Sequence, residues 1–340
     1  MSYYSFKNDY SEGAHINIIN ALSESNYIQD DGYGLDDFCK SAIEIICKKI
    51  NNPNADIHFI SGGTQANLIA ISSFLKPYES VISASTAHIA VHETGAIECT
   101  GHKINVVDTK DGKLKPDDIK NVLDYHTDEH MVKPKLVFIS NSTELGSIYL
   151  KKELQELSKF CKQNNLLLYC DGARLGAALT SPKNDLTLKD ISELVDAFYI
   201  GGTKNGALFG EALVITNNSL IENFRFNLKQ KGALLAKSRI MGIQFLELFK
   251  DDLFYDLAKH ANNMAMKMAK GIKKKGYKFL LEPSTNQIFP ILPDSVIDNL
   301  KNKYGFYVWS KYNKSNSVLR LVTSWNTDEN FIDSFLNDLE

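Results

Sequence analysis

The sequence predicts an α/β protein in which a large domain, built on a mostly parallel seven-stranded sheet, precedes a small C-terminal α+β domain. Two observations support the large domain. Seven short apolar runs alternate with stretches of helical periodicity, and several of the runs are almost wholly apolar, as expected for strands covered on both faces. A third observation is that this alternation stops after about residue 217, where long helical stretches and then short strands follow.

The seven predicted strands cover residues 57–60, 80–83, 104–107, 136–139, 166–169, 197–200 and 212–215. Between them, Pro116 followed by Asp117 and Asp118 predicts a helix start, because proline fits the first turn and acids favour its positive end. Apolar residues recur at helical spacing in 151–163, and another helix is expected at 66–75.

The C-terminal part predicts helices at 242–250 and 258–274, the second ending in a lysine-rich turn before Gly276. Short strands are expected at 277–281, 287–292, 306–309 and 318–322, and a final helix at about 328–339. We therefore divide the chain into a large domain, 15–240, and a small domain, 241–340, with the segment 1–14 outside both.

The composition narrows the class of protein. The 340 residues have the apolar and charged content of an ordinary globular chain, which excludes a collagen-like, disordered or low-complexity protein. A net charge of −3 argues against a nucleic-acid partner. The five cysteines form no C-x-x-C pair, so we expect no metal site and a reducing cytoplasm. Residues 1–15 lack the layout of a secretory signal, and no stretch is apolar enough for a membrane span.

The first chemical signal is the turn Ser61-Gly62-Gly63-Thr64-Gln65-Ala66-Asn67, which lies between a predicted strand and a predicted helix. Ligands of parallel sheets bind at the carboxyl ends of the strands, and the N–H groups of a helix N-terminus favour an anion such as phosphate. The alternative is an ordinary turn with a Ser or Thr cap, because the turn is neither a Walker A loop nor G-x-G-x-x-G.

Two further signals also follow predicted strands. Asp171-Gly172-Ala173-Arg174 pairs an acid, which suits a cationic ring nitrogen, with an arginine that suits a carboxylate. The alternative is a helix-capping Asp beside a surface Arg. Lys204 lies in the glycine-rich turn 201–206, where packing against protein would lower its pKa and favour imine formation with an aldehyde. The alternative is a lysine in contact with solvent.

The last signal is Arg320-Leu321-Val322-Thr323, an arginine within an apolar strand. A buried guanidinium requires an anion, whereas an edge-strand arginine would face water, and both readings stay open on this motif alone.

Taken in order along the chain, these motifs resemble the threonine aldolase and β-eliminating lyase group of fold-type-I enzymes that depend on pyridoxal 5'-phosphate (PLP). Residues 6–10, 32–36 and 61–67 are similar to motifs of that group, and 171–174 and 320–323 match it as they stand. The resemblance covers nearly the whole chain and implies the PLP-dependent aminotransferase-like fold, with the N-terminal segment 1–14 near the active site.

The resemblance implies a role for each matched residue. Lys204 would hold PLP covalently, Asp171 would pair with the pyridine nitrogen and His88, otherwise a core histidine, would stack on the ring; these three form the catalytic set. The implied cofactor-binding set is Gly63, Thr64, His88, Asp171, Arg174, Thr203, Lys204 and Lys237. The implied substrate-binding set is Asn8, Tyr33, Arg174 and Arg320.

Two of these assignments, Tyr33 and Lys237, have open alternatives. Tyr33 would reach the site of a neighbouring subunit or simply pack in the core. Lys237 stands for a basic phosphate ligand expected from another subunit within 229–239, and a solvated basic face is the alternative. Glu93 is a further candidate for the wall of the site.

One stretch departs from the group. Where these aldolases usually have Glu-Asn-Thr-His-Asn, this chain has residues 140–146, and we place Thr143 at the position of the histidine with Glu144 next to it. This departure bears on the proton path of the aldol reaction, and Glu144 or a water bound by His88 could substitute.

The resemblance implies cleavage of L-threonine and L-allo-threonine to glycine and acetaldehyde, through an external aldimine and a quinonoid. The alternative enzyme is a PLP-dependent β-eliminating lyase acting on another L-amino acid. A non-catalytic binding protein is a third possibility, against which the presence of both Lys204 and Asp171 argues. We expect a small amino acid as substrate, a homodimer or homotetramer with shared active sites, no nucleic-acid or membrane partner, and a cytoplasmic location.

Overall fold

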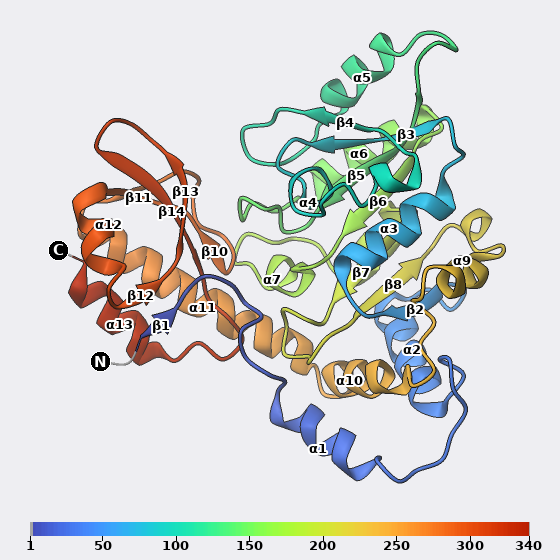
Figure 1. Cartoon of the computed structure of the whole chain (residues 1–340), viewed down its shortest axis with the longest axis horizontal. Helices are drawn as coiled ribbons and strands as arrows, with labels where there is room; N and C mark the ends of the chain where they lie inside the picture. The colour runs from blue at the N-terminus through green and yellow to red at the C-terminus, as the bar shows by residue number, and fades with distance from the viewer. Residues whose placement is uncertain (1–2, 340) are drawn as a thin grey trace.

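The computed structural model describes residues 3–339, and its main feature is the predicted seven-stranded sheet (Figure 1). The strand order is β2-β8-β7-β6-β5-β3-β4, and only β8 runs antiparallel to its neighbours. The strands are β2 (Asp56–Ile60), β3 (Glu79–Ala84), β4 (Ile104–Val107), β5 (Lys133–Ser140), β6 (Leu167–Asp171), β7 (Ala197–Gly201) and β8 (Glu211–Ile215). All seven predicted strands are therefore confirmed, with ends that differ by three residues at most.

Neighbouring residues of these strands enter two separate cores, one on each face of the sheet. Val137 and Phe198 belong to the core on one face, and Leu136 and Tyr199 belong to the core on the other. Since successive side chains of a strand point to opposite faces, strands buried on both sides must be apolar at nearly every position. This is the reason why the apolar runs marked the strands in the sequence.

Helices cover both faces of the sheet (Figure 1). The first face packs against α2 (Asp37–Ile50), α5 (Pro116–Tyr125), α6 (Lys151–Gln163), α8 (Leu188–Leu194) and α10 (Arg239–Lys250), and the second against α3 (Gly63–Phe74) and α9 (Phe224–Gln230). The remaining helices of this part are α1 (Ile16–Glu24), α4 (His88–Val91) and α7 (Leu175–Leu179), and Glu98–Thr100 and Asn218–Leu220 are 3₁₀ turns.

Local signals explain several of these helices. Pro116 is at the first position of α5, and the N–H of Lys115 donates to Asp118 Oδ2 over 2.8 Å. Asp36 caps α2 by accepting from the N–H of Cys39 over 2.8 Å. These contacts determine the residue at which each of the two helices begins.

The small domain is built on the antiparallel order β10-β14-β11-β9, with β13 also paired to β14. Its strands are β9 (Lys278–Phe279), β10 (Gln287–Ile288), β11 (Pro290–Pro293), β13 (Tyr307–Lys311) and β14 (Asn316–Val322). Its helices are α11 (Leu253–Lys274), α12 (Asp294–Leu300) and α13 (Glu329–Asp338). One predicted strand, 287–292, is thus two short strands separated by Phe289.

The N-terminal segment joins the small domain. Strand β1 (Tyr4–Ser5) pairs in parallel with β12 (Tyr304–Gly305), and Phe6 is buried in the small domain's core. The chain then passes from the small domain to α1 beside the large one, as the blue trace in Figure 1 shows. This path carries residues 7–15 across the space between the two domains.

The cores also locate the transition between the domains. Phe245 of α10 and Phe254 of α11 belong to the core of the large sheet, whereas Ala265 and Met268 of α11 belong to the core of the small domain. We therefore propose that the transition lies within α11 and that α10, which the sequence analysis assigned to the small domain, packs as part of the large one. Among the helices of residues 3–339, none has the length and apolar character needed to cross a membrane.

Candidate active site

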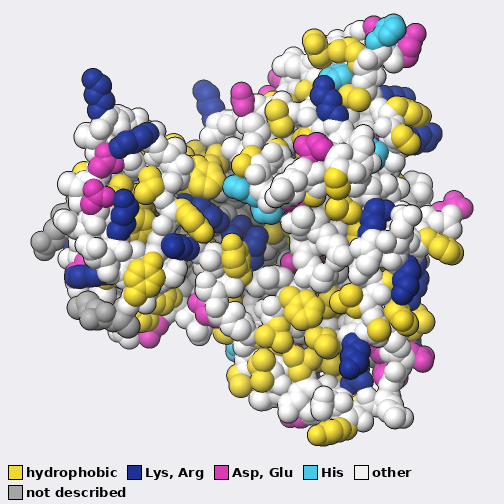
Figure 2. Space-filling model, in the orientation of Figure 1, with side chains coloured by type: hydrophobic (Ala, Val, Ile, Leu, Met, Phe, Trp, Pro, Cys, Tyr) yellow, Lys and Arg dark blue, Asp and Glu magenta, His cyan; other side chains and the backbone are white. Residues whose placement is uncertain are grey.

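The candidate site is a cavity of about 340 Å³ at the carboxyl edge of the large sheet. The residues that line it include Thr64 in the first turn of α3, Ser140 and Asp171 at the ends of β5 and β6, and Lys204 after β7. A second cavity of about 510 Å³ continues it toward β13 and β14 of the small domain. Figure 2 shows Lys, Arg and His side chains gathered in the hollow between the two domains.

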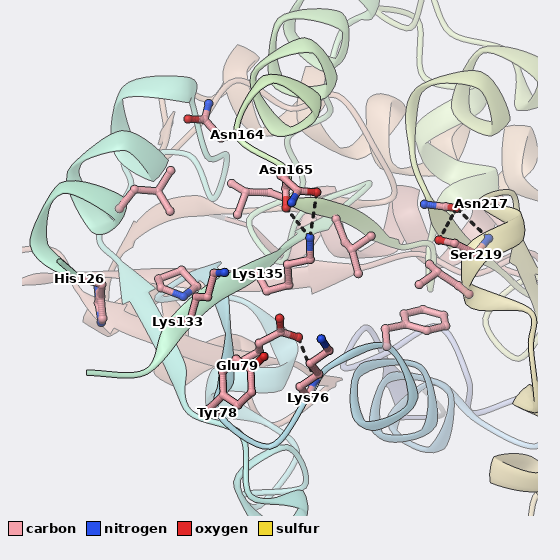
Figure 3. A pocket seen from close by; sticks show the side chains of 16 residues that line it. Lys76, Tyr78, Glu79, His126, Lys133, Lys135, Asn164, Asn165, Asn217 and Ser219 are labelled. Atoms are coloured by element: carbon pink, nitrogen blue, oxygen red, sulfur yellow. Dashed lines mark hydrogen bonds between the residues drawn. The ribbon is translucent and has the colours of Figure 1, made fainter. Parts of the chain in front are cut away.

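A larger cavity, of about 580 Å³, lies at the opposite edge of the sheet (Figure 3). It is lined by residues at the amino ends of the parallel strands, among them Glu79, Lys133 and Leu167. None of the site residues predicted from the motifs lines it. Since ligands of open parallel sheets bind at the carboxyl ends of the strands, we take the first two cavities as the candidate site.

Lys204 lines both cavities of the candidate site. Burial lowers the pKa of its amine, and the positive charge of Arg174 lowers it further, while Asp9, Asp171 and Glu211 oppose the shift. A neutral amine is the form that attacks a carbonyl carbon. The turn that holds Lys204 also requires close packing, because a Cβ on Gly201 would lie 2.4 Å from the carbonyl oxygen of Ala173.

Asp171 is the last residue of β6 and is buried in the wall of the first cavity. Its Oδ1 accepts from the hydroxyl of Tyr199 over 2.6 Å and from the N–H of Ala173 over 2.9 Å. Its Oδ2 accepts from Asn67 Nδ2 over 3.1 Å. Three donors thus fix the orientation of this carboxylate beside the cavity.

His88 lines both cavities, and its imidazole is hydrogen-bonded to Glu93. His88 Nδ1 lies 2.8 Å from Glu93 Oε1, which also accepts from Asn67 Nδ2 over 2.8 Å. Burial raises the pKa of Glu93. Glu93 itself is not among the residues that line the cavity, so it orients His88 instead of forming the wall that we predicted.

The N-terminus of α3 faces the same cavity. Gly62 is the N-cap and supplies no side-chain cap, and Gly63 and Thr64 line the cavity. The first N–H groups of a helix have no partner within the helix, so they are available to an anion. A Cβ on Gly63 would lie 2.8 Å from Tyr199 Oη, which explains why glycine is required here.

Thr203 lines the cavity, but its hydroxyl is already engaged. Thr203 Oγ1 donates to Glu211 Oε1 over 2.8 Å and accepts from the N–H of Gly210 over 3.0 Å. Burial raises the pKa of Glu211 to about 7. The predicted phosphate ligand Thr203 thus lies at the cavity, but its hydroxyl already donates its proton to the carboxyl group of Glu211.

The two predicted carboxylate-binding arginines lie in the second cavity, each with a partner. Arg174 Nε and Nη2 donate to the two carboxylate oxygens of Asp9 over 2.7 and 2.9 Å. Burial alone would raise the pKa of Asp9, but the charges of Arg174 and Lys204 outweigh it and hold that pKa low. Arg320 Nη2 donates to Gln287 Oε1 over 2.7 Å, and burial followed by the charge of Arg174 lowers the pKa of Arg320 to about 10.

Three predicted residues are not among those that line either cavity: Asn8, Tyr33 and Lys237. Asn8 Oδ1 accepts from the N–H of Tyr10 over 3.1 Å and so shapes the loop whose Tyr10 does line both cavities. The ring of Tyr33 packs under Lys229 Nζ, 4.5 Å from the ring centroid. Within one chain, therefore, Tyr33 and Lys237 lie apart from the cluster around Lys204.

The stretch that departs from the family pattern has a clear geometry. Thr143 is fully buried, its Oγ1 lies 2.8 Å from Ser147 Oγ, and it lines neither cavity. Glu144 lines both cavities. Thr143 is thus turned away from the cavities by its hydrogen bonds to Ser147, whereas Glu144, which the sequence analysis named as a substitute for the missing histidine, lines both.

The sequence analysis gave no role to Asp9, Tyr199, Gln287 or Glu211, although each contacts a predicted site residue. For Tyr199, a usable signal was present: a hydroxyl in a strand that ends just before Lys204. For Asp9 and Gln287 the contacts join residues far apart in the chain, and although Asp9 lies in the motif at 6–10, nothing in the sequence indicates these partners.

Comparison with known proteins gives consistent matches. Residues 18–294 match the family described as beta-eliminating lyase. The chain is 32% identical over 316 residues to a low specificity L-threonine aldolase from a Pseudomonas species, covering 91% of this chain and 89% of the relative. It is 31% identical over 315 residues to the enzyme of the same description from Pseudomonas aeruginosa, with the same coverage.

Solved structures give the same result. A threonine aldolase from Leishmania major matches with a TM-score of 0.97 and 48% identity, over 99% of this chain and 98% of that one. An aspartate aminotransferase from Thermus thermophilus matches with a TM-score of 0.74 and 12% identity, over 99% of this chain and 91% of that one, which shows a shared fold. The predicted aminotransferase-like fold type I is thereby confirmed.

Proposed function

We propose, from the premise that this chain belongs to the beta-eliminating lyase family, that it is a PLP-dependent aldehyde-lyase cleaving L-threonine and L-allo-threonine to glycine and acetaldehyde. The single observation that carries the proposal is the cluster of Lys204, Asp171 and His88 around one cavity at the carboxyl edge of the sheet. The similarity to threonine aldolases over nine-tenths of the chain supports this reaction among those of the family.

The described residues fit PLP at each of its functional groups. A buried amine with a lowered pKa suits imine formation with the aldehyde, and the buried carboxylate of Asp171 suits a protonated ring nitrogen. The uncapped N-terminus of α3, at Gly63 and Thr64, suits the phosphate. When bound, PLP supplies an electron sink for the Cα of the amino acid.

The chain's own residues then orient the reacting groups. Asp171, held by Tyr199, Asn67 and the N–H of Ala173, would pair with the protonated ring nitrogen of PLP. The imidazole of His88, fixed by Glu93, lines the cavity and would stack on the PLP ring. Lys204, which would hold PLP, would also be the amine that holds or returns a proton at the Cα of the substrate.

The carboxylate of the substrate is assigned to Arg320 and Arg174, which lie in the second cavity. Asp9 occupies Nε and Nη2 of Arg174, so Nη1 remains for the substrate. Binding the carboxylate at this place determines which Cα bond is aligned for cleavage, which is an orientation effect. Thr203 and Lys237 stay proposed phosphate contacts, and Asn8 and Tyr33 proposed substrate contacts. Asn8, Tyr33 and Lys237 do not line the site in this chain, so they would reach it only after a loop rearrangement or from a neighbouring subunit.

A β-eliminating lyase acting on another L-amino acid is the second candidate, favoured by the description of the matched family. The two functions are separated by their products. Cleavage of threonine yields glycine and acetaldehyde, whereas β-elimination yields a 2-oxo acid and ammonia. Release of glycine from L-threonine by the PLP-loaded enzyme is the expected result. Ammonia without glycine, across a panel of amino acids, would reject the aldolase in favour of the lyase.

We also propose a homodimer or homotetramer with shared active sites in the cytoplasm. Several large apolar side chains at α1, α9 and the loop between α1 and α2 are exposed, among them Tyr27, Tyr33, Leu35 and Phe226, which supports a subunit contact on that side. All five cysteines are free thiols, which supports a reducing compartment. Sedimentation of the purified protein tests the first statement, and a monomer would contradict it.

A further inference from the structure

Glu144 lies at the junction of the two cavities. Five residues line both of them, namely Tyr10, His88, Glu144, Arg174 and Lys204. The first cavity carries the residues assigned to PLP, and the second carries the arginines assigned to the substrate carboxylate. The reacting atoms of an amino acid bound between them would therefore pass next to these five side chains. Among the five, Glu144 is the only carboxylic acid.

The carboxyl group of Glu144 is held firmly on one side. Its Oε1 accepts from the N–H of His88 over 3.0 Å and from the hydroxyl of Ser140 over 2.8 Å. Within residues 3–339 no side chain bonds to Oε2. One oxygen is thus used to fix the group, and the other is left for a ligand in the cavity.

The surroundings of Glu144 raise its pKa and so make its carboxylate a better proton acceptor. Burial raises the pKa of Glu144, and the negative charge of Asp171 raises it further, while the hydrogen bond from Ser140 opposes the shift. A general base works best when its pKa is close to the working pH. The charged groups that line the same cavity from the neighbouring elements include Asp171 at the end of β6, Arg174 before α7 and Lys204 after β7, with His88 at the start of α4.

Resting on the proposed function, we propose that Glu144 is the catalytic residue that removes the proton of the substrate's β-hydroxyl. The proton moves from the β-oxygen to Oε2, and the O–H electron pair becomes the second bond of the new carbonyl. The Cα–Cβ bond breaks, and its electron pair remains on Cα, where the cofactor accepts it. Acetaldehyde leaves, a proton returned by Lys204 is added at Cα to complete glycine, and Glu144 gives up the proton it took from the β-oxygen to solvent, so that one proton is removed from the substrate and one is added.

The neighbouring side chains are weaker candidates for this step. Thr143 has its hydroxyl bonded to Ser147 and lines neither cavity. His88 has Nδ1 bound to Glu93 and is assigned to cover the ring face. Arg174 is committed to Asp9 and carries a positive charge.

The test compares Glu144→Gln with the unaltered enzyme, both loaded with PLP. Glutamine keeps an oxygen that accepts from His88 and Ser140, but it cannot take up a proton. We expect kcat for threonine cleavage to fall about a hundredfold or more, with KM changed less than about threefold. Binding of PLP and the change in its absorbance on addition of glycine should persist. Exchange of the glycine α-proton with deuterium should also persist, because neither involves a β-hydroxyl.

Thr143→Ser is the matched control, because it alters the adjacent buried residue, keeps its hydroxyl and should leave kcat within about twofold. If Glu144→Gln cleaves threonine within about threefold of the unaltered enzyme, the assignment of Glu144 is overturned. Loss of PLP binding or of glycine exchange in Glu144→Gln would also overturn it, since the role would then be structural. If the unaltered enzyme exchanges the glycine proton but releases no glycine from threonine, the proposed function fails and this inference fails with it.

Discussion

Asp9 and Arg174 form a buried two-point ion pair, with Arg174 Nε 2.7 Å from Asp9 Oδ2 and Nη2 2.9 Å from Oδ1. Asp9 is also bonded to Asn286 Nδ2 over 2.9 Å. A residue of the N-terminal segment thus fixes an arginine of the large domain and an asparagine of the small one. Through this contact, residues 7–15 contribute to the site by positioning Arg174, although few of them line the cavities.

Asp9→Asn is expected to weaken both the fold and substrate binding. Removing one partner of a buried ion pair leaves the other charge unpaired, so the free energy of unfolding should fall by about 3 kcal/mol. KM for threonine should rise about tenfold, because Arg174 loses the group that orients it. Denaturant unfolding and steady-state kinetics measure the two effects. Asp37→Asn, in an exposed pair with Lys40, is the control and should change stability by less than about 0.5 kcal/mol. Equal behaviour of the two variants would contradict the role of Asp9.

Tyr199→Phe should weaken the binding of PLP. The variant removes the 2.6 Å hydrogen bond to Asp171 Oδ1 and retains the ring beside Gly63. Hydrogen bonds to charged groups contribute about 1.5–3 kcal/mol, so the Kd for PLP should rise roughly tenfold or more. Titration of the apo form with PLP, followed by absorbance, gives the Kd. The exposed Tyr125→Phe is the control. An unchanged Kd in Tyr199→Phe would show that Tyr199 does not support the ring-nitrogen partner.

The two adjacent glycines of the α3 turn should respond differently to alanine. A Cβ on Gly63 meets Tyr199 Oη at 2.8 Å, whereas a Cβ on Gly62 meets nothing within 4 Å. Overpacking of a well-packed site costs about 1–3 kcal/mol, so Gly63→Ala should lower the free energy of unfolding of the apo form by that amount. Gly62→Ala should change it by less than about 0.5 kcal/mol. Equal destabilisation by both substitutions would contradict the packing described here.

The pH dependence of aldehyde capture follows from the lowered pKa of Lys204. Burial and Arg174 disfavour the charged amine, so the neutral form is reached at lower pH than for an ordinary lysine. The rate of imine formation by the apo form should therefore rise with pH and level off below the usual range of a lysine amine. Arg174→Met removes a positive charge and frees Asp9, and both changes raise the pKa of Lys204. The midpoint should then move to higher pH in stopped-flow measurements with pyridoxal. A midpoint that stays or moves down would contradict this electrostatic account.

The elements that the sequence predicted best are those with a strong local signal. The strands of the large sheet are apolar at nearly every position because helices cover both faces, and α6 was predicted at its observed bounds, Lys151–Gln163. Strand β1 has only two residues and forms by pairing with Tyr304 and Gly305 at the other end of the chain. No local pattern could indicate it.

In the candidate site, too, the residues with a local sequence signal were predicted, and those fixed by contacts to other parts of the chain were not. Lys204, Asp171 and Arg320 were found because each lies in a motif, His88 was found through the family resemblance, and the structure brings all four to adjoining cavities. The choice between Thr143 and Glu144 depended on which side chain a turn directs into the site. That direction is set by contacts to Ser147 and His88, which the sequence does not display.

The central claim is that Lys204 forms the imine with the vitamin B6 aldehyde. Its most direct test is borohydride reduction of the PLP-loaded protein, followed by digestion and mass spectrometry of the peptides. The account predicts one pyridoxyl group, attached to Lys204, and no adduct in Lys204→Ala. A reduced adduct on another lysine, or an equal yield of adduct in Lys204→Ala, would contradict it.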